Sequence, residues 1–260
     1  MKMVVIGGTG LVGSRLVERL RRDGHEPLTA SPDSGVNALT GEGLTEALED
    51  AQVVVDVSDA PAGDDATVLH FFQTSSRNLL AAETAARVGH HVTLSVVGAD
   101  RLPESSYFRA KSAQEEVVKG GPVPYTILRA APLFECIGRI ADSGTDADTV
   151  RLPPAFVQPE AADDVAGTLA DIAVGSPLND TVELAGPEAF RLDELARRLL
   201  KAGDDRRRVR TDVHARYFGG ELDDRSLAPS DDARIASTRF EDWLSRSAIS
   251  PSAISPSRPS

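Results

Sequence analysis

The stretch that decides the fold is Lys2-Met3-Val4-Val5-Ile6-Gly7-Gly8-Thr9-Gly10-Leu11-Val12-Gly13, close to the start of the sequence. Its apolar residues 3–6 predict a short buried strand, its glycines a tight turn, and residues 14–22 the helix that follows. One face of this helix is apolar and carries Leu11, Leu16, Val17 and Leu20. A strand, a glycine-rich turn and a helix in this order form the first half of a dinucleotide-binding unit.

The spacing of the glycines has a chemical reason. One glycine allows the sharp turn, one lets the backbone approach a pyrophosphate, and one lets the helix pack closely on the strand. Two registers fit, starting at Gly7 or at Gly8, and both give Gly10 and Gly13 the same roles. The alternative is a tight connection without a ligand. We expect a diphosphate at the positive end of the helix, held by Gly7, Thr9, Gly10, Leu11, Val12 and Gly13.

The overall charge argues against a nucleic-acid partner. The 260 residues include 28 basic and 40 acidic side chains, so the net charge is −12 and the pI about 4.9. Such a surface repels phosphate polymers. The one basic run, residues 206–210, is flanked by aspartates and predicts a solvated loop or helix end.

Cysteine usage and hydropathy bear on the compartment. Cys136 is the only cysteine, which excludes an intramolecular disulfide and a cysteine-based zinc site. The first apolar run covers only residues 3–6, and no stretch approaches the ~20 apolar residues of a membrane span. We therefore expect a cytoplasmic protein without a membrane partner.

Predicted strands and helices alternate along the first half of the chain, which favours an α/β fold with a doubly wound parallel sheet. Residues 52–57 predict a central strand buried on both faces, because they are apolar without alternation. We expect a dinucleotide-binding core over residues 1–130, a smaller substrate-binding lobe over 131–245 and a disordered tail over 246–260. The other strands of the core are predicted at residues 26–30, 36–39, 91–97 and 125–128.

The ends of two predicted strands bear on the choice of cofactor. An acid after the second strand favours NAD, whereas an arginine there favours NADP. The chain has Ser31-Pro32-Asp33-Ser34, which leaves the choice between NADP and NAD open. Val57 and Ser58, at the end of the central strand, are expected to line the same crevice.

A second group of residues predicts chemistry. Tyr107 and Lys111 are four positions apart and so share a face of one predicted helix. A lysine there would lower the pKa of the phenol and hold the nicotinamide ribose, while Tyr107 exchanges a proton with a carbonyl or alcohol. Ser95, near the end of the preceding strand, could bind the substrate oxygen. The alternative is a surface pair on an amphipathic helix.

The chain resembles the short-chain dehydrogenase/reductase superfamily in its atypical, NmrA-like branch. The resemblance rests on residues 4–13, 94–100, 107–111 and 124–129, and it continues through 162–166 to 238–244. It implies a doubly wound fold, a bound NADP or NAD, and a quinone, carbonyl or nucleotide-sugar substrate. It also implies that Ser95, Tyr107 and Lys111 are the catalytic residues, with Lys111 on the cofactor as well.

We therefore predict an NAD(P)H-dependent oxidoreductase that transfers hydride to a small carbonyl or quinone. The rival hypothesis is a redox sensor that binds the dinucleotide and a protein partner without turnover. By analogy with the family, two long helices near residues 67–87 and 107–118 are candidate faces of a homodimer. No metal site is predicted, because residues 142–148 lack the ligand spacing of a calcium loop and His90-His91 has no further ligand nearby.

Overall fold

A computed structural model describes residues 1–61 and 63–248 of the chain. Its centre is a sheet of seven parallel strands in the spatial order β14-β9-β5-β4-β3-β1-β2. From β1 the chain runs first to the edge strand β2 and then to β3 on the other side of β1. The remaining strands follow outward to the edge strand β14, so the strand order reverses at β1. The strands are β1 (Lys2–Ile6), β2 (Glu26–Ala30), β3 (Val53–Asp56), β4 (His90–Val96), β5 (Tyr125–Ala130), β9 (Asp180–Ala185) and β14 (Arg234–Ile235).

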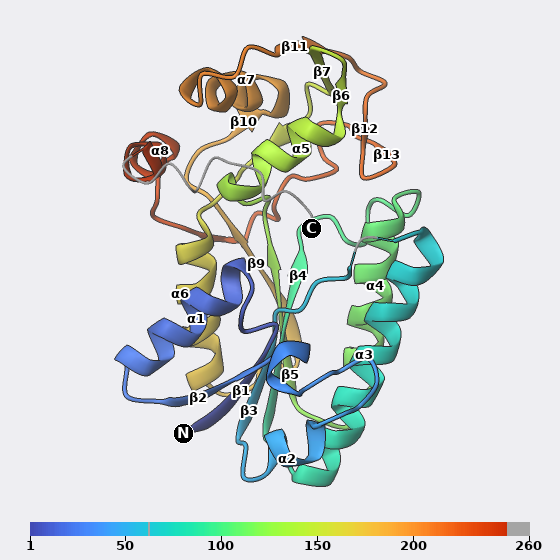
Figure 1. Ribbon diagram of the computed structural model, residues 1–260, viewed down its shortest axis with the longest axis vertical. Coiled ribbons are helices and arrows are strands. Elements are labelled where there is room, and N and C mark those ends of the chain that lie inside the picture. Colours follow the sequence, from blue (N-terminus) through green and yellow to red (C-terminus); the bar gives the residue numbers. More distant parts are fainter. Residues whose placement is uncertain (62, 249–260) are drawn as a thin grey trace.

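Helices cover both faces of this sheet (Figure 1). One face carries α1 (Leu11–Arg22) and α6 (Ala162–Val174), and the other carries α2 (Leu44–Leu48), α3 (Asp65–Ala86) and α4 (Ser106–Lys119). This arrangement confirms the predicted doubly wound α/β fold.

The residues of β3 explain why the sheet needs two helix layers. Val53 and Val55 pack into the cluster under α1 and α6, whereas Val54 packs into the cluster under α2 and α3. All three are 5% exposed or less. A strand covered on both faces is apolar throughout, as residues 52–57 predict.

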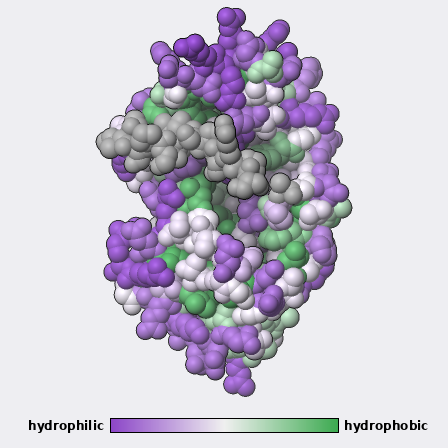
Figure 2. All heavy atoms as spheres, viewed as in Figure 1, coloured by the Kyte–Doolittle hydropathy of each residue, from purple (hydrophilic) through white to green (hydrophobic). Residues whose placement is uncertain are grey.

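A second group of elements packs at the end of the sheet where the parallel strands finish (Figure 1). Its own core contains Phe134, Phe240 and Trp243, whose rings lie 5.3 to 6.1 Å apart. Figure 2 shows the surface hollowed between this group and the sheet, with apolar residues in the hollow. The elements are η2 (Phe134–Cys136), α5 (Ile137–Ser143), β6 (Thr145–Asp146), β7 (Thr149–Leu152), β8 (Phe156–Val157), β10 (Phe190–Arg191), α7 (Leu192–Ala202), β11 (Arg208–Thr211), β12 (Arg216–Tyr217), β13 (Gly220–Glu221) and α8 (Phe240–Ala248).

The division between a core and a smaller lobe at residue 130 stays a prediction. Parts of the chain after residue 130 nevertheless belong to the central sheet and its helix layer. The strands β9 and β14 complete the central sheet, and α6 packs beside α1. The predicted strand at residues 36–39 is wrong. The side chain of Asn37 there accepts hydrogen bonds from the amides of Leu39 and Thr40 and so folds a turn. Most of the predicted tail, from residue 249 on, lies outside the described residues.

Candidate functional site

The glycine turn has the geometry that its sequence predicts. Gly7 has a φ of +76°, a conformation that favours glycine, and a Cβ on it would lie 2.8 Å from the backbone of Ser58. A Cβ on Gly13 would lie 2.2 Å from the carbonyl oxygen of Gly7. Gly10 differs, since a Cβ there would meet only that same carbonyl oxygen, at 3.3 Å. Gly7 and Gly13 are therefore required by packing, whereas a Cβ on Gly10 would have this one tight contact.

The first turn of α1 is left free to bind an anion. Gly10 occupies the N-cap position and has no side chain to cap the helix, and the first turn contains no acidic residue. By contrast, Asp64 caps α3 and accepts a hydrogen bond from the amide of Thr67. The amides at an uncapped N-terminus lack acceptors and carry the positive end of the helix dipole. A dinucleotide diphosphate therefore fits at Thr9, Gly10, Leu11 and Val12.

The end of β3 lies against this turn. Asp56 is buried, and its Oδ1 accepts hydrogen bonds from the backbone N of Ser58 at 3.0 Å and from the Ser58 Oγ at 2.6 Å. These bonds fold Val57 and Ser58 back toward Gly7. On the other side of β1, Ser31 follows the last residue of β2 and is 6% exposed. The predicted cofactor residues Gly7, Ser31 and Ser58 thus lie at the ends of three neighbouring strands.

Lys111 points into the interface between α4 and the sheet. Its side chain is 3% exposed, and its Nζ donates to the carbonyl oxygen of Leu94 at 2.8 Å and to Oε1 of Gln114. Gln114 in turn donates to Oδ2 of Asp56 at 3.0 Å. Burial lowers the pKa of Lys111, and nearby carboxylates, Asp56 foremost, offset part of this. Lys111 is therefore linked through Gln114 to the carboxylate that positions Ser58.

Ser95 takes part in a separate buried network. It is 1% exposed, and its Oγ donates to Oε1 of Glu115 at 2.7 Å. Arg129 donates to both oxygens of that carboxylate, each at 2.8 Å. Burial alone would raise the pKa of Glu115, but the hydrogen bonds from Arg129 and Ser95 hold it below its usual range. Glu115 is thus a paired, charged group on the buried face of α4.

Tyr107 lies in an aromatic wall rather than beside Lys111. Its ring stacks on Phe218, with centroids 5.3 Å apart, and makes edge contacts with Phe72 and Phe108 at 6.2 and 5.8 Å. Burial raises the pKa of Tyr107 well above its usual range, and the charge of Asp59 adds to the rise.

The direction of this shift is opposite to the one that the sequence predicts. The ammonium of Lys111 is turned toward Leu94 and Gln114 and is not among the charges that act on the phenol. Within the described residues, the phenol of Tyr107 forms no hydrogen bond with Ser95 or Lys111. The structure therefore brings the three predicted catalytic residues to one helix and its neighbouring strand but does not join their polar atoms.

Cys136 and Arg139 belong to the same side of the molecule as Tyr107. Arg139 donates to the Sγ of Cys136 at 3.1 Å. Burial raises the pKa of the Cys136 thiol, which therefore stays neutral near pH 7. The charge of Asp59 raises the pKa of Tyr107, and the charge of Arg139 lowers it. No motif in the sequence marks Gln114, Glu115 or Arg139.

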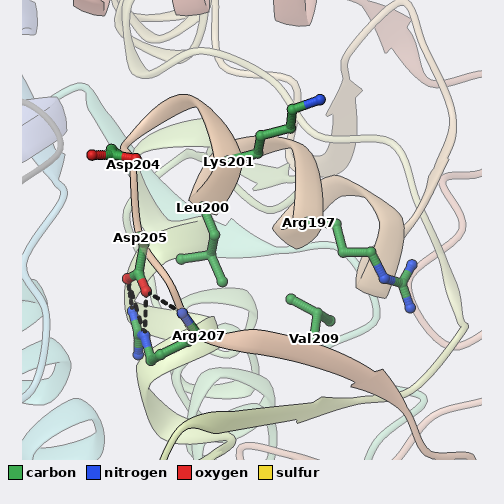
Figure 3. Close-up of a pocket in the computed structure, with 7 residues that line it drawn as sticks. All are labelled: Arg197, Leu200, Lys201, Asp204, Asp205, Arg207 and Val209. Carbon is green, nitrogen blue, oxygen red and sulfur yellow. Dashed lines mark hydrogen bonds and ion pairs between the residues drawn. The ribbon is translucent and has the colours of Figure 1, made fainter.

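A surface pocket of about 210 Å³ lies elsewhere, between α7 and β11 (Figure 3). Its Arg207 pairs with Asp205 at 2.7 Å, and its Arg197 pairs with Asp193 at 2.9 Å. Lys201 and Asp204 line it as well, and α7 and β11 lie at the outer end of the molecule, away from α1 (Figure 1). Over residues 1–61 and 63–248, no cluster of three or more potential metal ligands is present. No helix in this part of the chain is long and apolar enough to cross a membrane.

Comparison with curated proteins finds distant relatives. The chain is 27% identical over 156 residues to the photosystem II assembly factor Ycf39 of Synechocystis sp., covering 54% of this chain and 48% of the relative. It is 26% identical over 229 residues to the NADH dehydrogenase [ubiquinone] 1 alpha subcomplex subunit 9 of Arabidopsis thaliana, covering 74% and 55%. The chain thus spans about half the length of the curated relatives it matches.

Solved structures share the fold at low sequence identity. Pal from Bacillus thuringiensis is 13% identical, with a TM-score of 0.74 and coverage of 98% of this chain and 100% of that one. The dTDP-glucose 4,6-dehydratase DesIV from Streptomyces venezuelae, solved with NAD, is 16% identical, with a TM-score of 0.73 and 96% coverage of both chains.

The family match decides the assignment. Residues 7–173 match the family described as NAD(P)H-binding, which agrees with the resemblance to the atypical, NmrA-like short-chain dehydrogenases/reductases. The matched segment starts at the glycine turn and includes Ser95, Tyr107 and Lys111. The chain belongs to the NAD(P)H-binding family, and its cofactor is NADP or NAD.

Proposed function

We propose that this protein is an oxidoreductase that uses NADPH or NADH to reduce a small carbonyl or quinone. The proposal is supported by the uncapped first turn of α1, which can hold the dinucleotide, and by Tyr107, whose ring stacks on the exposed ring of Phe218. The dinucleotide supplies the hydride that the substrate carbon accepts.

Tyr107 would act as the acid. The phenol is protonated at neutral pH and has a proton to give, but its raised pKa makes it a weaker acid, so the bound dinucleotide and substrate would have to lower that pKa. Its O–H bond breaks as the proton moves to the substrate oxygen, and the phenolate then regains a proton from water. The aromatic ring of Phe218 fixes the orientation of the phenol and excludes water from one of its faces.

Ser95 and Lys111 would need new partners to take their predicted roles. Ser95 must exchange its hydrogen bond with Glu115 for one with the substrate oxygen. Lys111 must leave the carbonyl of Leu94 to reach the nicotinamide ribose. Each exchange takes a donor from a buried oxygen, of Glu115 or Leu94, and the new hydrogen bond to the ligand would offset part of that cost.

The uncapped first turn of α1 also fits a second candidate, a dinucleotide-binding sensor without turnover. In this case Ser95 and Lys111 keep their present partners and serve the packing of α4 on the sheet. The relatives include an assembly factor and a subunit of a large complex, which supports a role through a protein partner.

A Tyr107→Phe variant separates the two candidates. The enzyme requires the phenol, so turnover of a quinone and aldehyde panel should fall by about 100-fold or more in the variant while dinucleotide affinity stays unchanged. Tyr125→Phe is the matched control, because Tyr125 lies at the start of β5, at the opposite end of the sheet. Full turnover by Tyr107→Phe would contradict the acid role, and dinucleotide binding without any turnover by the wild type would favour the sensor.

A further inference from the structure

Phe218 has a backbone conformation that is unfavourable for a bulky residue. It is the first of the two residues that join β12 to β13, and its φ is +47°, followed by +85° at Gly219. Such turns favour glycine, asparagine and aspartate, and an aromatic residue there is strained. In the described part of the chain, the other residues that have a positive φ and are not glycine are Asp50, Arg87, Ala147, Asn179 and Asp204. Phe218 is thus the one aromatic residue in this set, and the turn itself does not explain it.

Burial does not explain Phe218 either. Its side chain is 47% exposed, whereas the preceding Tyr217 is 6% exposed and belongs to the core of the second group of elements. An apolar ring that stays half exposed stabilises the fold much less than a buried one. Strain without a matching gain in burial indicates that this ring has a role outside the packing of its own hairpin.

The hairpin tip is fixed to the start of α4. Ser105 occupies the N-cap position of this helix, where a serine side chain commonly accepts a hydrogen bond from the first turn. Among the described residues its side chain makes no such bond, and its Oγ donates instead to the carbonyl oxygen of Phe218 at 2.7 Å. Ser105 is fully buried. Because the acceptor belongs to the main chain, this bond holds the tip in place whatever side chain residue 218 carries.

The ring of Phe218 is in contact with the proposed proton donor. It stacks on Tyr107, with centroids 5.3 Å apart and an interplanar angle of 28°, and it makes an edge contact with Tyr217 at 4.8 Å. Tyr107 in turn contacts the rings of Phe72 and Phe108, which are both buried. Phe218 is therefore the half-exposed member of a connected row of rings. A substrate that receives the proton of Tyr107 would lie close to it.

We propose that Phe218 determines the substrate specificity, because its exposed surface contacts a planar conjugated ring of the substrate. This proposal rests on the proposed oxidoreductase function and narrows its substrate class to quinones and aryl carbonyl compounds, as opposed to aliphatic ones. The faces and edges of aromatic rings carry opposite partial charges, so an aromatic side chain favours a planar aromatic partner over a saturated ring of the same skeleton. The strained turn is then explained by the place where it holds the ring.

The test compares 2-naphthaldehyde with its fully saturated decahydro derivative. The two compounds share the aldehyde and the ring skeleton and differ in planarity. In Phe218→Asn, which suits the left-handed turn and removes the ring, the ratio of kcat/KM for the planar to the saturated aldehyde should fall about fivefold or more. Phe218→Tyr retains a ring and should keep the ratio within about twofold of the wild type. Phe156→Thr is the matched control, because it removes a ring of β8 that is 39% exposed.

The ratio separates specificity from a structural role. If Phe218 only held Tyr107 in place, Phe218→Asn would lower kcat/KM for both aldehydes by the same factor, and the ratio would not change. An unchanged ratio would therefore overturn the proposal. So would an equal fall in Phe156→Thr.

A binding measurement distinguishes failure of this proposal from failure of the proposed function. Affinities for both aldehydes are measured by calorimetry on protein loaded with the oxidised dinucleotide, which has no hydride to transfer. If the wild type prefers the planar aldehyde, Phe218→Asn loses this preference and neither compound is reduced with NADPH or NADH, the aromatic contact holds and the oxidoreductase is wrong. If both aldehydes are reduced but the planar one binds equally well to the wild type and to Phe218→Asn, the oxidoreductase holds and the aromatic contact is wrong. A wild type that does not bind the planar aldehyde also overturns the contact.

Discussion

The glycine turn and the Ser95–Lys111 region lie side by side at the end of the same sheet, but they differ in what their structure already provides. In the glycine turn, the backbone makes the site, since no side chain caps the amides at the start of α1. In the second region the polar side chains are already used, because Ser95 is bonded to Glu115 and Lys111 to Leu94 and Gln114. A backbone site is complete before its ligand arrives, whereas the side-chain site must first exchange partners.

The largest effect is expected from Gly13→Ala. The new Cβ would lie 2.2 Å from the carbonyl oxygen of Gly7, and neither backbone segment can yield easily. We expect the free energy of unfolding to fall by about 3 kcal/mol, measured by urea denaturation. The control is Gly138→Ala on α5, where a Cβ meets nothing within 4 Å and stability should not fall. Equal stability of the two variants would show that packing does not require Gly13.

A smaller effect is expected from Arg129→Met. The variant leaves the carboxylate of Glu115 buried with only Ser95 and Lys119 as partners. Because Arg129 is partly exposed, we expect a loss of about 2 kcal/mol in the free energy of unfolding. Arg77→Met, at an exposed position of α3, should cost little. A loss no greater than that of the control would mean that the network around Ser95 is not structural.

The same variant should change the response to acid. The folded-state pKa of Glu115 lies below its unfolded value of 4.5, so its contribution to stability is present above pH 4.5 and is lost as the pH falls further. Arg129→Met removes the main group that lowers this pKa. The stability of the variant should therefore depend less steeply on pH between about 3 and 5 than that of the wild type.

The smallest effect is expected from Glu160→Gln. Glu160 is fully buried. Its Oε1 accepts a hydrogen bond from the amide of Ala131, the residue after β5, at 2.9 Å. Its Oε2 has no partner among the described residues. Burial raises its pKa well above 4.5, so the folded carboxyl stays protonated while the unfolded one ionises, and the wild type loses stability as the pH rises above 4.5.

Glu160→Gln removes this loss. At pH 7 the variant should be more stable by about 1 kcal/mol, and at pH 4 the two proteins should be equal, as measured by urea denaturation at each pH. Glu221→Gln, at an exposed position of β13, should show no such difference. A variant that is less stable than the wild type at pH 7 would show that Glu160 is charged in the folded protein.

The sequence predicts the glycine turn better than it predicts the contacts of Ser95 and Lys111. The glycine turn follows from backbone sterics, which depend on Gly7 and Gly13 alone. The direction of the Lys111 side chain depends on Gln114 and Asp56, and Asp56 comes from a strand more than fifty residues earlier.

For Ser95, the sequence itself indicates a side chain on the buried face of its strand. The strand period of two places Ser95 on the same face of β4 as His91 and Thr93, which are both fully buried. That face packs against α3 and α4, where Glu83 bonds His91 and Glu115 bonds Ser95. The return of β9 and β14 to the sheet could not be predicted in this way, because short strands carry no information on their partners.

The most direct test of the dinucleotide site is a titration of Gly10→Asp with NADPH and NADH, in which binding is measured by fluorescence. Gly10 has an extended φ of −76°, and a Cβ there would meet only the carbonyl oxygen of Gly7, at 3.3 Å, which a small shift relieves. An aspartate should therefore cap α1 and leave the free energy of unfolding close to that of the wild type. The same carboxylate would occupy the amides and repel the diphosphate, so affinity should fall about 100-fold, or 2.7 kcal/mol. Gly10→Ala, which adds only a Cβ, should lose less than about tenfold. Wild-type affinity in a folded Gly10→Asp variant would show that the first turn of α1 does not hold the dinucleotide.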